Sequence, residues 1–286
     1  MKFLKQLGCA AALALSTMGS AQASILMNNW VFNPTGGGFD SGLQVNEYLD
    51  VNGNAFIQLT PSGPTSFTFR EHAVFNLVQA DSTSSKLFPM LFPGGNITAT
   101  LEATGSGKFN GAFAFESGTI RMYQNPANGQ YGTAAGIYGA NLGKQIAQFD
   151  VLAGGGGKVS ANCSPTNNGQ VTVHAEAVAG TIAAGYFFDS NGVDLSTQPL
   201  FAFAFTNANT LINPRTRLVS EVACEFSGFK GRGCNGQTYR NVDRQNFFIG
   251  GNGQFKLAEV PEPGSVALFG IALAGIGALR RRVKAA

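Results

Sequence analysis

The chain has 286 residues, of which 44% are hydrophobic and 12% charged, and a formal net charge of +3. This length is enough for one large domain or two small ones with a real hydrophobic core. Six of the 19 basic residues and one of the 16 acidic ones lie in the two ends, so residues 24–259 hold 13 basic and 15 acidic groups. The basic character of the whole chain belongs to its ends and gives no reason to expect a nucleic-acid partner.

The N-terminal segment, residues 1–23, has the three-part layout of a secretory signal peptide. Two lysines precede an apolar run over residues 7–18, and Ala21-Gln22-Ala23 forms a small-x-small cleavage site. A buried N-terminal helix is the alternative interpretation. We predict a signal peptide, with an exported mature chain that starts near Ser24.

Strands are predicted from period-two alternation between turn signals. In residues 66–77 the odd positions are mainly apolar and the even positions mainly polar. This alternation, with many β-branched and aromatic residues, is typical of strands with one buried face. Asn-Gly occurs seven times, and this pair suits the tight turns that join paired strands. The predicted strands cover residues 43–49, 55–60, 66–79, 96–104, 109–116, 118–124, 146–152, 170–179, 181–188, 200–206, 218–226 and 254–259.

The fold class follows from the number of these strands. No internal segment has convincing helical periodicity over three turns, although residues 133–148 are rich in Ala and Gly and ambiguous. About a dozen short strands favour a single all-β domain over residues 24–259. We predict an antiparallel β-sandwich or a jelly-roll-like fold, flanked by the signal peptide and a C-terminal transmembrane helix.

Glu71 is the candidate for acid chemistry. In the predicted strand it lies on the face that carries Phe67 and Phe69, whereas His72 points to the opposite face. A carboxyl group on an apolar face could be an acid with a raised pKa, but an ion pair or a place at the sheet margin explains it as well. The chain has no G-x-S-x-G elbow. We expect no enzyme; a polysaccharide-modifying enzyme that pairs Glu71 with another acid is the least favoured alternative.

A candidate calcium loop occupies residues 189–194, DSNGVD. Asp189, Asn191 and Asp194 would supply oxygen ligands at spaced positions, which calcium requires. The glycine at position six and the glutamate at position twelve of an EF-hand loop are missing. A plain hairpin turn explains the same residues, so calcium is a candidate ligand and no other cofactor is expected.

The three cysteines of the body suit an exported protein. In an oxidising compartment a Cys224–Cys234 disulfide that closes a short loop is expected, and Cys163 would be left over. No C-x-x-C pair occurs in the chain, so a structural zinc site is not expected.

Two sets of candidates could meet a polysaccharide. Most aromatic side chains in a β-protein with 24 phenylalanines lie in the core, and ordinary solvation explains the cations equally well. The aromatic candidates for sugar platforms are Trp30, Tyr123, Tyr131, Tyr138 and Tyr186. The cations concentrated in one stretch of the body are Arg215, Arg217, Lys230, Arg232, Arg240 and Arg244.

The C-terminal tail, residues 260–286, combines three features in a fixed order. Pro261-Glu262-Pro263 comes first, an apolar run follows over residues 264–279, and Arg280-Arg281-Arg282 ends it. Sixteen helical residues rise about 24 Å, slightly less than the hydrocarbon core of a bilayer. The arginines favour the cytoplasmic side, which places the body outside the inner membrane.

These three features together resemble the PEP-CTERM sorting tail of Gram-negative bacteria. The resemblance implies processing by exosortase, a membrane cysteine transpeptidase, after a transient stay in the inner membrane. Segments of the body, among them Phe67-Thr68-Phe69-Arg70-Glu71-His72 and Tyr186-Phe187-Phe188-Asp189, are similar to the flocculation-associated PEP-CTERM proteins. This likeness implies a matrix or adhesion protein at the cell surface that promotes floc or biofilm formation with exopolysaccharide. A lectin-like exopolysaccharide-binding module is the alternative.

Overall fold

The computed structural model describes residues 25–81, 96–125, 130–159, 169–240 and 245–259. Leu26–Ala258 forms one compact unit, and of a second unit, residues 1–25 and 259–286, only Ile25 and Glu259 are described. The predicted signal peptide, the sorting motif Pro261-Glu262-Pro263, the arginines 280–282 and Cys163 therefore lie outside the described residues. Among the residues that are described, no helix is long and apolar enough to cross a membrane.

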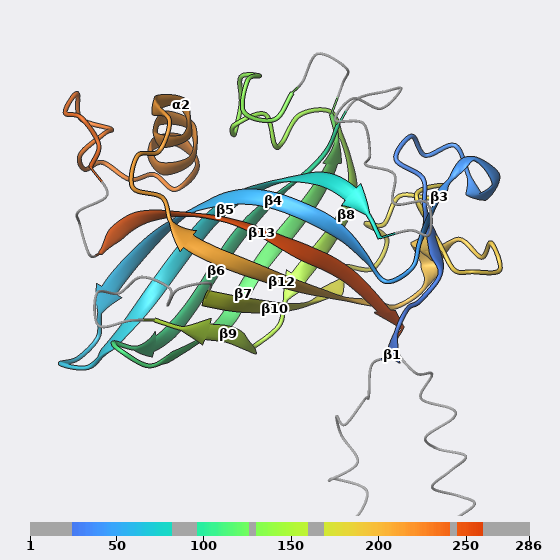
Figure 1. Cartoon of the computed structure of the whole chain (residues 1–286), viewed down its shortest axis with the longest axis horizontal. Helices are drawn as coiled ribbons and strands as arrows, with labels where there is room; N and C mark the ends of the chain where they lie inside the picture. The colour runs from blue at the N-terminus through green and yellow to red at the C-terminus, as the bar shows by residue number, and fades with distance from the viewer. Residues whose placement is uncertain (1–24, 82–95, 126–129, 160–168, 241–244, 260–286) are drawn as a thin grey trace, which may run out of the picture. The chain divides into compact units, whose positions relative to one another are not determined.

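The compact unit is built around one antiparallel sheet that closes on itself. The strands of the closed ring are β4 (Tyr48–Pro61), β5 (Ser66–Ala80), β6 (Ile97–Lys108), β7 (Ala112–Gln124), β8 (Lys144–Val151), β10 (Gly169–Ala177), β12 (Leu200–Thr210) and β13 (Asn246–Glu259). They pair in this order, and β13 returns to pair with β4 from Asn246 opposite Gln58 to Lys256 opposite Tyr48. Figure 1 shows this closing pair as the red β13 beside the blue β4. The sheet is a barrel.

Shorter strands complete the unit. β1 (Ile25–Leu26) extends the sheet beside β13, and β9 (Gly154–Lys158) pairs with both β10 and β7. A separate small sheet has the order β11 (Phe187–Phe188), β2 (Trp30–Phe32) and β3 (Leu43–Val45). Two single turns of 3₁₀-helix, Phe39–Ser41 and Leu195–Thr197, adjoin these strands in sequence.

The prediction of an all-β, antiparallel protein is confirmed, but the β-sandwich or jelly-roll form is wrong. Two sheets packed face to face are absent from the described residues, because the β4–β13 pairing closes a single sheet. Alternation of apolar and polar residues shows that each strand buries one face. It does not show whether that face meets a second sheet or the far wall of its own barrel.

Strand alternation divides the core into an inner and an outer part. Along β5 the buried odd positions, among them Phe67, Phe69 and Leu77, belong to the large cluster inside the barrel. Val74 points to the other side and belongs to a second cluster, which covers the outer face. The inner cluster is the larger of the two and consists mainly of aliphatic and phenylalanine side chains.

Asn-Gly pairs occur both in turns and inside strands. Asn110 follows the end of β6 with a positive φ of 59°, as the tight turn between β6 and β7 requires. Asn52-Gly53 and Asn252-Gly253 instead lie in the middle of β4 and β13, where Asn52 is directly opposite Asn252. A Cβ atom on Gly53 would come within 2.1 Å of the Phe75 ring, so close side-chain approach explains this glycine.

The predicted strand at residues 218–226 is wrong, because this segment is helical. A short α-helix, α2 (Thr216–Leu218), runs into a π-helical segment, η3 (Val219–Phe226). Leu218, Val219, Val222 and Ala223 are buried at helical spacing and pack with Phe56, Val74 and Phe248 on the outer face of the barrel. The segment is short and rich in Val, a composition that does not separate a buried helix from a strand.

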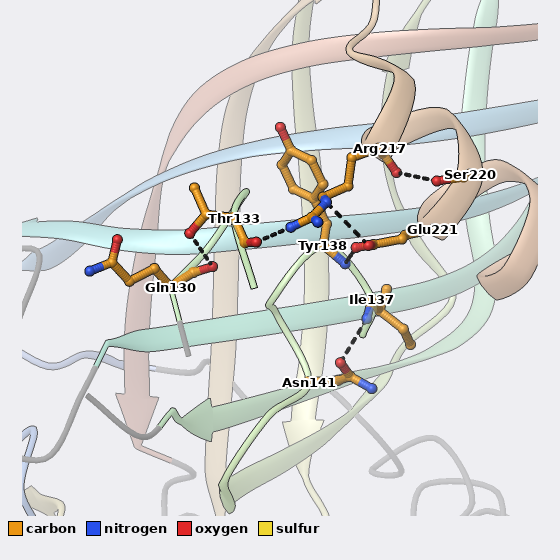
Figure 2. Close-up of polar contacts among 8 residues, drawn as sticks. All are labelled: Gln130, Thr133, Ile137, Tyr138, Asn141, Arg217, Ser220 and Glu221. Carbon is orange, nitrogen blue, oxygen red and sulfur yellow. Dashed lines mark hydrogen bonds and ion pairs between the residues drawn. The ribbon is translucent and has the colours of Figure 1, made fainter. Parts of the chain in front are cut away.

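Polar contacts fix this helix to the loop between β7 and β8 (Figure 2). The Tyr138 N–H donates to Glu221 Oε2 at 2.8 Å, and Arg217 Nε lies 3.4 Å from Glu221 Oε1. Arg217 also donates to the Thr133 carbonyl oxygen. Cys224, near the end of the helix, is joined to Cys234 by a disulfide with a Cα–Cα distance of 5.4 Å. The helix is therefore held at both ends.

Candidate functional site

A polar groove lies on the outer face of four neighbouring strands. Its described lining residues are Asp50, Gln170, Thr206, Asn207, Asn252, Gly253, Gln254 and Lys256. They come from β4, β10, β12 and β13, which are consecutive in the ring. The groove has a volume of about 470 Å³. We call it the outer groove.

Sheet register aligns the amide and acid side chains of the outer groove. Gln254 is directly opposite Asp50, and Gln170 is directly opposite Asn207. In β13 the neighbouring odd positions Phe255 and Leu257 are buried, so the even positions point outward. Because side chains alternate between the two faces of each strand, polar groups from strands far apart in sequence lie on one face.

The charges at one end of the outer groove are coupled. Lys256 forms an ion pair with Glu47, and its ammonium group lies 5.5 Å from the centre of the Tyr48 ring. Partial burial, and then the negative charge of Asp81, raise the pKa of Asp50. Burial and nearby carboxylates, Asp50 first among them, also raise the pKa of Tyr48, although a hydrogen bond with Gln254 opposes this. These contacts hold Tyr48 beside the amides.

The sequence did not indicate the outer groove, because its residues are spread over more than 200 positions. A local signal was present in β13, where Asn252, Gln254 and Lys256 alternate with buried residues. Only the strand order shows that Asp50 and Gln170 belong to the same surface.

The candidate calcium residues lie in a turn and in the segment that follows it. Asp189 Oδ1 accepts the N–H groups of Asn191 and Val193, both at 2.8 Å, and the Asn191 side chain donates to Asp189 Oδ2 at 3.3 Å. Burial slightly disfavours the charged form, but these hydrogen bonds lower the pKa of Asp189. Asp194 instead accepts from Gly185 N at 2.7 Å and Ser196 N at 2.8 Å.

Both carboxylates thus already act as acceptors for backbone N–H groups, as in a plain turn and a helix cap. In the described part of the chain, no group of three or more His, Cys, Asp or Glu side chains could hold a metal ion. Calcium binding at residues 189–194 stays a prediction.

The idea that Trp30, Tyr138 and Tyr186 are sugar platforms is wrong, because all three side chains are buried. Tyr186 packs in the inner core, and its hydroxyl donates to Gln124. Tyr131 is largely covered and donates to the Val74 carbonyl oxygen at 3.1 Å. Large aromatic side chains gain most from burial, and sequence alternation does not reveal which of them reach the surface.

The predicted cation cluster lies in the segment that contains the helix. Its described members are all exposed: Arg215, Arg217, Lys230, Arg232 and Arg240. Arg244 lies outside the described residues. None of these residues lines the outer groove as described.

Glu71 lies inside the barrel, on the apolar face where the sequence placed it. Its side chain is 8% exposed and lines three cavities of the interior. Burial alone raises its pKa to about 7. The described residues that line these cavities include no second acid with which Glu71 could form a catalytic pair. His72, on the opposite face, packs edge-on against Phe226 with the ring centres 5.0 Å apart.

Comparison with known families identifies the tail. The model of the PEP-CTERM protein-sorting motif matches residues 259–282, a span that includes Pro261-Glu262-Pro263 and the three arginines. The chain carries a PEP-CTERM sorting motif. The PEP-CTERM motif implies export, transient membrane anchoring, processing by exosortase and sorting to the cell surface. No curated protein and no solved structure matches the chain.

Proposed function

We propose that this PEP-CTERM protein is an extracellular matrix or adhesion protein that promotes floc or biofilm formation by binding exopolysaccharide through the outer groove. The observation that supports this role is the array of amide, carboxyl and ammonium groups that four strands present on one face. The role requires no catalysis. Export with transient anchoring in the inner membrane of a Gram-negative bacterium brings the body to the compartment where the polysaccharide lies.

The chemistry of the outer groove suits a polysaccharide. Sugar hydroxyls both donate and accept hydrogen bonds, and the side-chain amides of Gln170, Asn207, Asn252 and Gln254 do the same. Asp50 adds an acceptor and Lys256 a donor at one end, where the Lys256 ammonium group also lies over the Tyr48 ring. A long strand-lined groove fits a linear chain without enclosing it.

The experiment is a titration of the exported protein, purified without detergent, against the exopolysaccharide of the producing organism. Replacing Asn252 and Gln254 together by alanine is expected to weaken binding at least tenfold. The matched control is Thr68→Ala, an exposed position on the outer face of β5. Arg232→Gln tests the exposed cations instead. If R232Q loses binding while the Asn252 and Gln254 double variant binds normally, the assignment to the outer groove is contradicted.

Two further arms separate the alternatives. If the outer groove binds the polysaccharide without calcium, neither a chelator nor the variant Asp189→Asn should change the affinity. Loss of binding with both the chelator and the variant would favour a calcium-dependent lectin-like module. A gene deletion should abolish settling of cells, and the groove variant should fail to restore it. Normal settling of the deletion strain would refute the matrix role itself.

A further inference from the structure

The interior of the barrel contains three adjoining cavities that share one polar side chain. Their volumes are about 40, 60 and 30 Å³. Glu71 lines all three, and their other described lining residues are almost all apolar. Thr206 lines two of them and Asn54 lines one. A barrel of about eight strands has an interior wide enough for packed side chains or one small ligand.

Small residues line part of this interior. Gly53 and Gly251, at opposed positions of β4 and β13, line the smallest cavity, although the Phe75 ring and the Asn207 carbonyl oxygen already occupy the places of their missing side chains. Ala99 and Ala204, on β6 and β12, line the largest. Larger rings line another of the three cavities: Phe69 and Phe113, whose ring centres are 5.6 Å apart, both line it together with Glu71. The interior therefore has one cavity lined largely by aromatic rings and others lined partly by small residues.

Glu71 has no partner of its own in this interior. It lies between Ile57 on β4 and Ala103 on β6, its cross-strand neighbours. No hydrogen bond or ion pair joins its carboxyl group to another described residue, and burial is the sole cause of its raised pKa. A buried carboxyl group without a partner destabilises a fold, so a leucine or a methionine would serve packing better.

We propose that the barrel interior is a binding site for a small, mainly apolar molecule with one hydrogen-bond donor, a hydroxyl or an amino group, which contacts Glu71. The apolar body of the molecule would lie against side chains such as Phe75, Met122 and Phe255, which line the largest cavity with Glu71. Its donor would form a hydrogen bond with the carboxyl group, which no described residue of the protein does. This site is separate from the outer groove, and its existence does not depend on polysaccharide binding.

The test uses the exported protein, purified without detergent, and three probes of equal chain length: 1-octanol, octylamine and octyl methyl ether, which lacks the donor. Isothermal titration should show saturable binding of the alcohol and the amine, with the ether at least tenfold weaker. Glu71→Leu should remove this difference between probes, because the carboxyl group that distinguishes them is gone. Ala204→Met, which fills the largest cavity, should weaken all three.

The matched control is Glu102→Gln, which removes a half-exposed carboxyl group of β6 that pairs with Arg121. It should leave every affinity within twofold of the parent. Circular dichroism checks that each variant is folded, and Glu71→Leu should fold readily because it replaces a buried polar group by an apolar one. The proposal is overturned if no probe saturates, if the ether binds as tightly as the alcohol, or if Glu71→Leu keeps the tenfold preference.

Discussion

Replacing Glu71 by glutamine removes the only titratable group among the described residues that line the three interior cavities. The pKa of Glu71 is raised from 4.5 to about 7 because the carboxyl group is buried. In the folded protein the group therefore keeps its proton at pH values where the unfolded chain has released it. Since the folded state binds more protons, the free energy of unfolding falls as the pH rises from about 4.5 to about 7.

The magnitude follows from the shift. A pKa raised from 4.5 to about 7 corresponds to a total loss of about 3 kcal/mol. By pH 5 roughly 1 kcal/mol of this has already been lost, because most of the unfolded chains are ionised there. Between pH 5 and pH 8 the Glu71→Gln variant should therefore gain about 2 kcal/mol in stability relative to the parent.

The assay is urea denaturation of both proteins at unit pH intervals from 4 to 8. The difference in unfolding free energy between parent and variant isolates Glu71, because the remaining groups titrate alike in both. Glu102→Gln, which removes a half-exposed carboxyl group, provides the control, and its unfolding free energy should stay within about 1 kcal/mol of the parent, as expected for an exposed ion pair. A flat profile for Glu71→Gln would refute the reasoning, because it would mean that water or an unrecognised partner solvates the buried carboxyl group.

Three further predictions concern the helix and the tail. Replacing Cys224 and Cys234 by serine should lower the unfolding free energy by about 3 kcal/mol, from the entropy of the ten-residue loop, and a midpoint of urea denaturation equal to that of the oxidised parent would contradict this. Glu221→Ala should lower the unfolding free energy by about 1–2 kcal/mol because the Tyr138 N–H and Arg217 both lose their partner. The exposed Glu225→Ala should lower it by less than half as much, and equal losses would argue against the contacts in Figure 2. Changing Pro261-Glu262-Pro263 to alanines should leave an uncut, membrane-held protein on an immunoblot, and normal release would count against exosortase processing.

Much of the strand content could be predicted from the sequence, because most long strands here have one buried face. β5 and β10 followed directly from their alternation, and so did the inward position of Glu71. Closure of the sheet could not be predicted, since it depends on the pairing of β4 with β13, nearly 200 residues apart. The same long-range pairing keeps Asn52-Gly53 extended in a strand, against its local preference for a turn.

The candidate sites, too, depend partly on local sequence patterns and partly on long-range strand pairing. Local patterns identified a carboxyl group on an apolar face, but the cavities around it depend on Gly251 and Ala204 from strands late in the chain. The outer groove depends equally on strand order. The helix was missed because Val219 and Val222 are residues that strands also favour. The sequence left open whether Trp30 and Tyr186 lie in the core or on the surface, because alternation within a strand does not show what the small second sheet packs against.

The pairing of β4 with β13 has a consequence for the order of events during export. Export directed by the predicted N-terminal signal peptide would move the chain across the membrane from its N-terminus. β4 would then arrive early, and β13, which ends at Glu259 where the sorting motif begins, would arrive last. Until then the edges of β4 and β12 lack their partner, and unpaired edges are templates for aggregation. Non-local pairing is also slow to form. The nascent protein therefore has its greatest need of a chaperone in the interval before its last strand emerges.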